Sequence, residues 1–188
     1  MHERRYSAAI ERLRDPERIA LLEIERVTAL SLEGMAAGNV MDIGTGSGLF
    51  AEAFAGRGLV VTGVDTNPEM LAAAREFVPD GDFVRGSLEE LPFEDLSFDL
   101  VFLGHVLHEA DDLLHALAEA KRCARVRVAI LEWPYKEEDK GPPQHHRLQP
   151  DDILLAASAV GFSRIEWITL EHMEYFRLGI TEHGASHR

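Results

Sequence analysis

The sequence predicts an α/β fold in which a mostly parallel sheet carries helices on both faces. Short apolar runs of strand length alternate along the chain with segments of helical spacing, which is the pattern of repeated βαβ units. Two of the runs, 40–43 and 59–65, each carry one acid at or near their C-terminal end, where parallel strands open into a ligand crevice. The length of 188 residues fits one domain with its own core.

The stretch 40–50 is the most informative part of the chain. A buried strand with Asp42 near its end leads into three alternating glycines over 44–48, and a helical pattern begins at Leu49. Glycine accepts positive φ and lets a ligand approach the backbone closely, and a helix start adds unpaired N–H groups beside the loop. The stretch therefore predicts a binding loop, although a tight turn shaped only for packing is the alternative.

The spacing of the glycines indicates which ligand the loop binds. A dinucleotide fingerprint needs its third glycine where Leu49 stands, and a P-loop needs a lysine that is absent, so NAD and nucleotide triphosphates are disfavoured. The pattern Asp-x-Gly-x-Gly-x-Gly resembles motif I of the class I S-adenosylmethionine (SAM)-dependent methyltransferases. A second acid, Asp65, follows at the distance expected for a residue that accepts hydrogen bonds from ribose hydroxyls.

The resemblance, which spans about residues 36 to 178, implies both the fold and the cofactor site. It implies a Rossmann-like, seven-stranded, mostly parallel sheet with strand 7 antiparallel. It also implies an N-terminal helical cap over 1–38, a SAM-binding core over 39–178 and a tail over 179–188. In that family the acid and the loop hold the methionine part of SAM, whereas here Ser87 stands where relatives carry an acid for adenine. The implied site comprises Asp42, Gly44, Thr45, Gly46, Gly48, Asp65, Thr66, Ser87, Leu88 and Gly104.

The residues on either side of the core predict the acceptor site. Spacing predicts a short helix that includes Tyr6, Ile10 and Leu13, and the Asp15-Pro16 start then predicts one helix that ends near Gly34. A polar, proline-rich loop occupies 134–150. We expect both segments to close over the acceptor, although a solvated connector is the alternative for the loop. The predicted contact residues are Tyr6, Trp133, His145, His146 and Arg147. His105, after the strand at 97–103, is the candidate general base, and His108 is interpreted as a polar loop residue.

Composition and charge exclude several other classes of protein. The net charge of −14 argues against broad binding to nucleic acid, and no apolar run reaches membrane-spanning length. The single cysteine, Cys123, excludes an intramolecular disulfide, and the histidine spacings match no zinc motif, so we expect no metal. No signal-peptide pattern follows Met1. These features predict a cytoplasmic location. For the assembly, the sequence leaves a monomer and a homodimer equally open.

The function predicted from the sequence is SAM-dependent methyl transfer to a small-molecule acceptor, with S-adenosylhomocysteine (SAH) as product. The resemblance is to the small-molecule branch near the quinone-biosynthesis type enzymes, and the motif of amino-directed nucleic-acid methyltransferases is absent after residue 103. The reaction implied is in-line displacement, with a base needed only when the acceptor must lose a proton. A SAM- or nucleoside-binding regulatory protein without turnover is the alternative, which Ser87 and the missing Lys-Pro-Gly-Gly motif permit.

Overall fold

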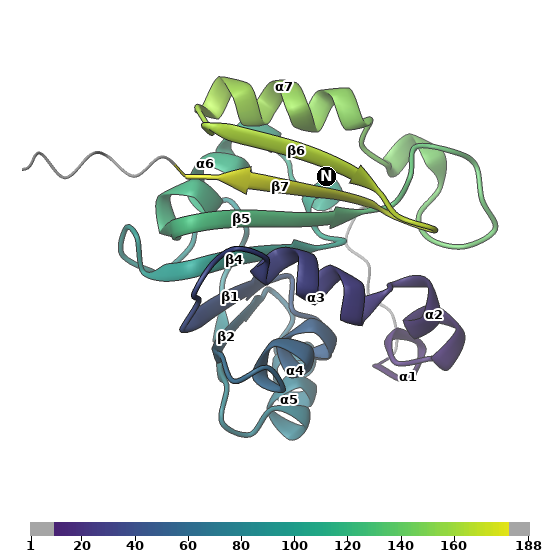
Figure 1. Cartoon of the computed structure of the whole chain (residues 1–188). Helices are drawn as coiled ribbons and strands as arrows, with labels where there is room; N and C mark the ends of the chain where they lie inside the picture. Colours follow the sequence, from purple (N-terminus) through teal and green to yellow (C-terminus); the bar gives the residue numbers. More distant parts are fainter. Residues whose placement is uncertain (1–9, 181–188) are drawn as a thin grey trace, which may run out of the picture.

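A computed structural model describes residues 10–180 of the chain and contains one seven-stranded sheet (Figure 1). The strand order is β3-β2-β1-β4-β5-β7-β6, and all strands except β7 run in the same direction. The strands are β1 (Asn39–Ile43), β2 (Val60–Asp65), β3 (Asp82–Arg85), β4 (Phe98–Gly104), β5 (Ala124–Glu132), β6 (Arg164–Thr169) and β7 (Glu174–Gly179). This topology confirms the predicted Rossmann-like sheet with an antiparallel strand 7.

Helices cover both faces of the sheet, with α3, α4 and α5 on one side and α6 and α7 on the other (Figure 1). The helices are α1 (Ile10–Leu13), α2 (Pro16–Leu21), α3 (Ile24–Leu32), α4 (Leu49–Ala55), α5 (Pro68–Phe77), α6 (Leu113–Cys123) and α7 (Pro150–Val160). Two short 3₁₀ turns, η1 (Leu107–Glu109) and η2 (Gln144–His146), lie in loops after β4 and β5. Local caps set several starts: Asp15, Asn67 and Asp112 each accept backbone N–H groups of the helix that follows.

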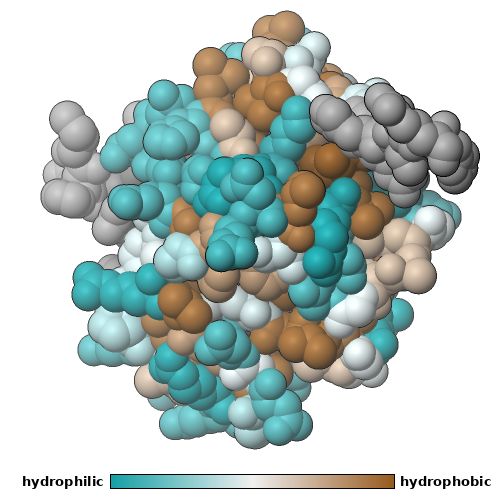
Figure 2. Space-filling view, turned by 90° about the vertical axis from the view of Figure 1, so that its left-hand side faces the viewer, coloured by the Kyte–Doolittle hydropathy of each residue, from teal (hydrophilic) through white to brown (hydrophobic). Residues whose placement is uncertain are grey.

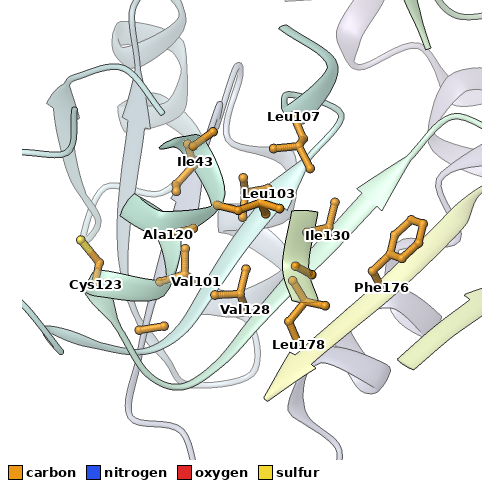
Figure 3. Close-up of a cluster of buried hydrophobic side chains, with 14 of the residues drawn as sticks. Ile43, Val101, Leu103, Leu107, Ala120, Cys123, Val128, Ile130, Phe176 and Leu178 are labelled. Carbon is orange, nitrogen blue, oxygen red and sulfur yellow. The ribbon is translucent and has the colours of Figure 1, made fainter. Parts of the chain in front are cut away.

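The sheet is buried on both faces because successive side chains of a strand point in opposite directions. In β4, Val101 and Leu103 join the core under α6 and α7, whereas Leu100 and Phe102 join the core under α3 to α5. Figure 3 shows the first of these cores, with side chains of β4, β5 and β7 meeting Ala120 and Cys123 of α6. Burial on both faces explains why the central strands read as continuous apolar runs.

The N-terminal segment differs from the single helix that the spacing predicts. Helix α2 ends at Leu21, and Glu23 takes a left-handed conformation with φ of +45° before α3 begins. The Glu23 carboxylate accepts hydrogen bonds from Arg26 and from the Glu171 N–H, so tertiary partners hold the break. The break lets α3 pack on the sheet while α1 and α2 lie over the carboxyl ends of the strands, where Leu13 and Arg18 line a cleft.

The surface of the described part is mixed in polarity. On the face shown in Figure 2, hydrophilic and hydrophobic residues are interspersed. Within residues 10–180, no helix combines the length and the apolar character that crossing a membrane requires.

Candidate functional site

A cleft of about 690 Å³ lies at the carboxyl ends of the parallel strands. Strands β1 to β5 all end at this edge, so the loops that follow them converge on one space. Helices α1 and α2 border it through Leu13 and Arg18, and the loop after β5 borders it through 141–143 and His146. The cleft is large enough for a small molecule with several rings.

The glycine loop after β1 requires the residues it has. Gly44, Gly46 and Gly48 have φ between +52° and +77°, a region that other residues avoid. A Cβ on Gly44 would lie 2.5 Å from a methyl carbon of Val106. The Gly44 and Thr45 N–H groups donate to the Val64 carbonyl at 2.8 and 3.0 Å, which fixes the loop to β2.

Asp42 supports this loop from below and does not line the cleft. Its carboxylate is buried and accepts a hydrogen bond from the Thr45 hydroxyl at 2.8 Å. Burial raises the pKa of Asp42 to about 7, and the nearby Asp65 charge adds to the rise against the Thr45 hydrogen bond. Asp42 therefore acts on the shape and charge of the loop, not through the cleft wall.

Asp65 faces the cleft at the end of β2. Its Oδ2 accepts the Gly46 N–H at 2.9 Å and its Oδ1 accepts the Asn67 N–H at 2.8 Å. A carboxylate oxygen can accept more than one hydrogen bond, so a carboxylate at this position suits the two hydroxyls of a vicinal diol. The first of these bonds links the end of β2 directly to the glycine loop, so the two parts of the expected cofactor site form one unit.

After β3, Ser87 and Leu88 border the cleft. Ser87 forms an isolated β-bridge with Glu90, which holds the turn in place. Glu89 also borders the cleft, but its Oε1 accepts the Asp112 N–H at 2.7 Å. This bond fixes Glu89 to the loop before α6.

His105 forms part of the wall after β4. It has a φ of +56°, and its backbone N–H donates to the Leu131 carbonyl at 2.8 Å. Its ring stacks on Trp133 with centroids 5.0 Å apart, and its Nε2 lies 3.2 Å from the sulfur of Met173. Burial holds the pKa of His105 well below its usual range, so the ring is neutral at pH 7.

His108 and Glu132 form a buried pair that the sequence did not reveal. His108 Nδ1 lies 2.9 and 3.1 Å from the two carboxylate oxygens of Glu132. The backbone N–H of His108 donates to the same carboxylate at 3.1 Å. Both side chains are less than a tenth exposed, and His108 borders the cleft. Burial alone lowers the pKa of His108, but the charge and hydrogen bond of Glu132 outweigh it and the pKa is raised. Burial likewise raises the pKa of Glu132, but His108 reverses the shift and the pKa is lowered.

Arg147 organises the loop between β5 and α7. Its buried guanidinium donates to the carbonyls of Pro142, Pro134 and Lys140 at 2.7 to 2.9 Å, and pairs with Glu138 at 2.9 Å. These partners lie within the loop, so Arg147 does not face the cleft.

The same loop meets the N-terminal helices at its exposed side. Lys140 pairs with Glu17 of α2 at 3.0 Å. His146 borders the cleft, while the exposed His145 packs edge-on against it with ring centroids 4.3 Å apart. The loop and α2 together therefore cover one end of the cleft.

The structure brings most of the predicted site residues together. Those that border the cleft are Gly44, Gly46, Asp65, Thr66, Ser87, Leu88, Gly104, His105, Trp133 and His146. Those that do not border it are Asp42, Thr45, Gly48, His145 and Arg147, and Tyr6 lies outside the described residues. The wall also includes residues that sequence reasoning missed: Leu13, Arg18, Asn67, Met70, Val106, His108, Glu109, Asp111, Gly141, Pro142 and Pro143. Glu132 had one signal, an acid at the C-terminal end of a buried strand, but its partner was not recognisable.

Charged and aromatic groups divide the cleft into two halves. The β1–β3 half has a glycine backbone and Asp65, which suit a ribose and an amino-acid group. The β4–β5 half has His105, His108 and Trp133. Within residues 10–180, no group of three or more histidine, cysteine or acidic side chains is arranged to hold a metal ion.

Comparisons with known proteins agree with this geometry. A family model described as a methyltransferase domain matches residues 41–130. The demethylmenaquinone methyltransferase of Chlorobaculum tepidum is 39% identical over 92 residues, which are 48% of this chain and 38% of that protein. The curated relatives that the chain matches are thus covered over less than half of their own length.

Solved structures match over more of the chain. A SAM-dependent methyltransferase from Aquifex aeolicus superposes with a TM-score of 0.80 at 26% identity, covering 92% of this chain and 97% of that one. The magnesium protoporphyrin IX methyltransferase of Synechocystis, crystallised with SAH, superposes with a TM-score of 0.68 at 16% identity, covering 87% and 85%. At 16% identity, this second similarity supports the fold alone.

Proposed function

Because this chain belongs to the class I SAM-dependent methyltransferases, we propose that it transfers the methyl group of SAM to a small molecule bound in the β4–β5 half of the cleft. The observation that carries the proposal is the extent of the cleft. It continues beyond the glycine loop and Asp65 to a second wall of His105, Trp133 and His146, which the cofactor residues do not need. A second ligand is the simplest occupant of that half.

SAM is the cofactor, and it supplies an activated methyl group. We assign its methionine part to the glycine loop, its ribose hydroxyls to Asp65, and its adenine to the turn at Ser87 and Leu88. The order β1, β2, β3 along the edge of the sheet supports these assignments, because it places the three segments side by side at the cleft. The protein's main contribution is orientation of the acceptor for in-line attack, which is worth effective molarities on the order of 10⁵ M or more.

Several features support a small acceptor. The Lys140–Glu17 ion pair joins the loop after β5 to α2, and Leu13 of α1 approaches the glycine loop at Gly46. The loop after β5 and the N-terminal helices therefore cover parts of the cleft, which suits an acceptor of limited size. The net charge of −14 argues against a nucleic-acid substrate.

The proposal is tested by calorimetry followed by a product assay. We expect SAM and SAH to bind in the micromolar range, about −8 kcal/mol, and NAD not to bind. A panel of hydroxylated and amino small molecules should then include at least one that releases SAH in proportion to methylated product. Asp65→Ala should weaken SAM binding, whereas the exposed control Asp80→Ala should not.

Three results would refute parts of this proposal. Tight NAD binding without SAM binding would overturn the cofactor assignment. SAM binding without SAH release from any acceptor would favour a regulatory SAM-binding protein. Loss of SAM affinity in His146→Ala would mean that the loop after β5 binds the cofactor and not the acceptor.

A further inference from the structure

The buried pair of His108 and Glu132 lies at the wall of the acceptor half and is not explained by SAM binding. His108 belongs to η1 after β4, and Glu132 is the last residue of β5. Both Glu132 oxygens are engaged, and both lie within 3.1 Å of His108 Nδ1. In addition, Oε1 accepts the backbone N–H of His108 at 3.1 Å and Oε2 accepts that of Trp133 at 3.3 Å. A charged carboxylate in so buried a place needs such partners.

The pairing determines which nitrogen of the ring carries the proton. An ionised carboxylate only accepts hydrogen bonds, so Nδ1 must be the donor toward Glu132. In the neutral ring, Nε2 then holds the free lone pair. His108 also borders the cleft, so its ring is close enough to act on a molecule bound there.

The other charged groups near His108 leave this arrangement in place. Glu109 on the same turn raises the pKa of His108, and Arg147 from the loop after β5 lowers it, but both effects are smaller than that of Glu132. The neighbouring His105 has a lowered pKa, and its Nε2 lies against Met173. His108 is therefore the stronger base of the two, and it is the better oriented.

We propose that His108, positioned by Glu132, is the general base of the methyl transfer, and that the acceptor is a neutral, flat molecule with an ionisable hydroxyl, such as a phenol or an enol. The inference rests on the proposed function. His108 Nε2 takes the hydroxyl proton as the oxygen lone pair forms the new bond to the methyl carbon. The carbon–sulfur bond breaks with its electrons on sulfur, giving SAH and the methyl ether. The imidazolium then pairs with Glu132 and returns its proton to solvent.

The charges around the acceptor half favour this class of substrate. Glu132, Glu109 and Asp111 place negative charge at or next to the wall, and Arg18 of α2 adds one positive charge, so acidic groups outnumber basic ones and disfavour an acceptor that arrives as an anion. A neutral hydroxyl enters without this cost, and its oxyanion forms only as the imidazolium forms beside it. Trp133 is buried against His105, and together with the prolines at 142 and 143 it makes this wall of the cleft largely apolar, which suits an aromatic ring.

The first test needs no acceptor. Nuclear magnetic resonance of histidine-labelled protein reports the tautomer and the pKa of each ring. We expect the Nδ1–H tautomer at His108, a pKa above the usual value of about 6.5, and a lower pKa in Glu132→Gln. An Nε2–H tautomer in the wild-type protein would overturn the proposal, and this readout does not depend on whether any variant folds.

The second test uses 4-nitrophenol, whose phenolate absorbs visible light, with SAH-loaded protein one pH unit below the probe's own pKa. The wild-type protein should bind the probe as phenolate, and His108→Asn should bind it as phenol, with at least a tenfold lower ionised fraction. The matched control is His115→Asn on the exposed face of α6, which should behave as wild type. A bound probe that stays a phenol in the wild-type protein, or one that does not bind, would refute the proposal.

The two proposals fail in different ways. If SAH does not bind in calorimetry, the proposed function fails. If SAH binds normally but the probe is not ionised, only the role of His108 and the hydroxyl class of acceptor are lost.

Discussion

Replacing Asp42 by asparagine should change how the stability of the protein depends on pH. Asp42 lies beneath the glycine loop, and its carboxyl group is 2% exposed. Burial raises its pKa from 3.8 to about 7. Asparagine has nearly the same shape, keeps an oxygen that can accept the Thr45 hydroxyl bond, and stays neutral at every pH.

The size of the effect follows from the raised pKa. Because the pKa of Asp42 is raised in the folded state, the folded protein favours the protonated carboxyl. The contribution of this carboxyl to the free energy of unfolding is fully present below pH 3.8 and is lost as the pH rises through about 7. Each pH unit in this window is worth about 1.4 kcal/mol, so the whole loss is about 4 kcal/mol. Asp42→Asn does not lose this stability, because asparagine does not ionise. Its advantage over the wild-type protein should grow by about 1.4 kcal/mol per pH unit between pH 5 and 7 and then level off.

The measurement is urea unfolding of both proteins at pH 5, 6, 7 and 8.5, with the free energy of unfolding extrapolated to water. Asp80→Asn, in an exposed turn, is the matched control and should give a difference that does not change with pH. Parallel pH profiles for the wild-type protein and Asp42→Asn would refute the reasoning, since they would mean that the buried carboxyl ionises normally.

Three further changes probe the rest of the site. Asp65→Ala should weaken SAM binding by about 2–4 kcal/mol in calorimetry, because a hydrogen bond to a charged group contributes roughly 1.5–3 kcal/mol; unchanged affinity would remove the ribose assignment. Gly44→Ala should lower Tm and weaken SAM binding more than tenfold, because the new methyl group would overlap Val106 at a φ of +68°. Arg147→Ala should expose the loop after β5 to limited proteolysis about tenfold faster with SAM affinity retained; an unchanged cleavage rate would refute its organising role.

Where residues close in sequence determine the structure, the sequence alone was sufficient to predict it. Asn67 followed by Pro68 predicts the start of α5, and the structure begins the helix at Pro68 with Asn67 as its cap. The alternating glycines predict a loop with positive φ, because few other residues tolerate that conformation. In both cases the signal lies within a few residues of the feature it predicts.

Where partners are distant in sequence, prediction failed for a physical reason. His108 and Glu132 are 24 positions apart and meet because β4 and β5 are adjacent and in register, with Gly104 opposite Leu131. Without knowledge of that register, nothing in the sequence indicates that a histidine in a polar loop pairs with an acid at the end of a strand. Arg147 is a similar case, since a cation in a loop suggests an anionic ligand until its carbonyl partners are seen.

The same contrast separates the two halves of the cleft. The cofactor half is built around the glycine loop, whose backbone conformation a short motif specifies. The acceptor half is made of side chains from η1, β5 and the loop after it, and Glu132, Met173 and Arg147 hold that wall in place. A small change in any of these supports alters the acceptor wall while the glycine loop keeps its bonds to Val64 and Asp65. Substrate choice can therefore vary with little effect on SAM binding, which is why motif I identifies the cofactor while the acceptor must be inferred from the pair at His108.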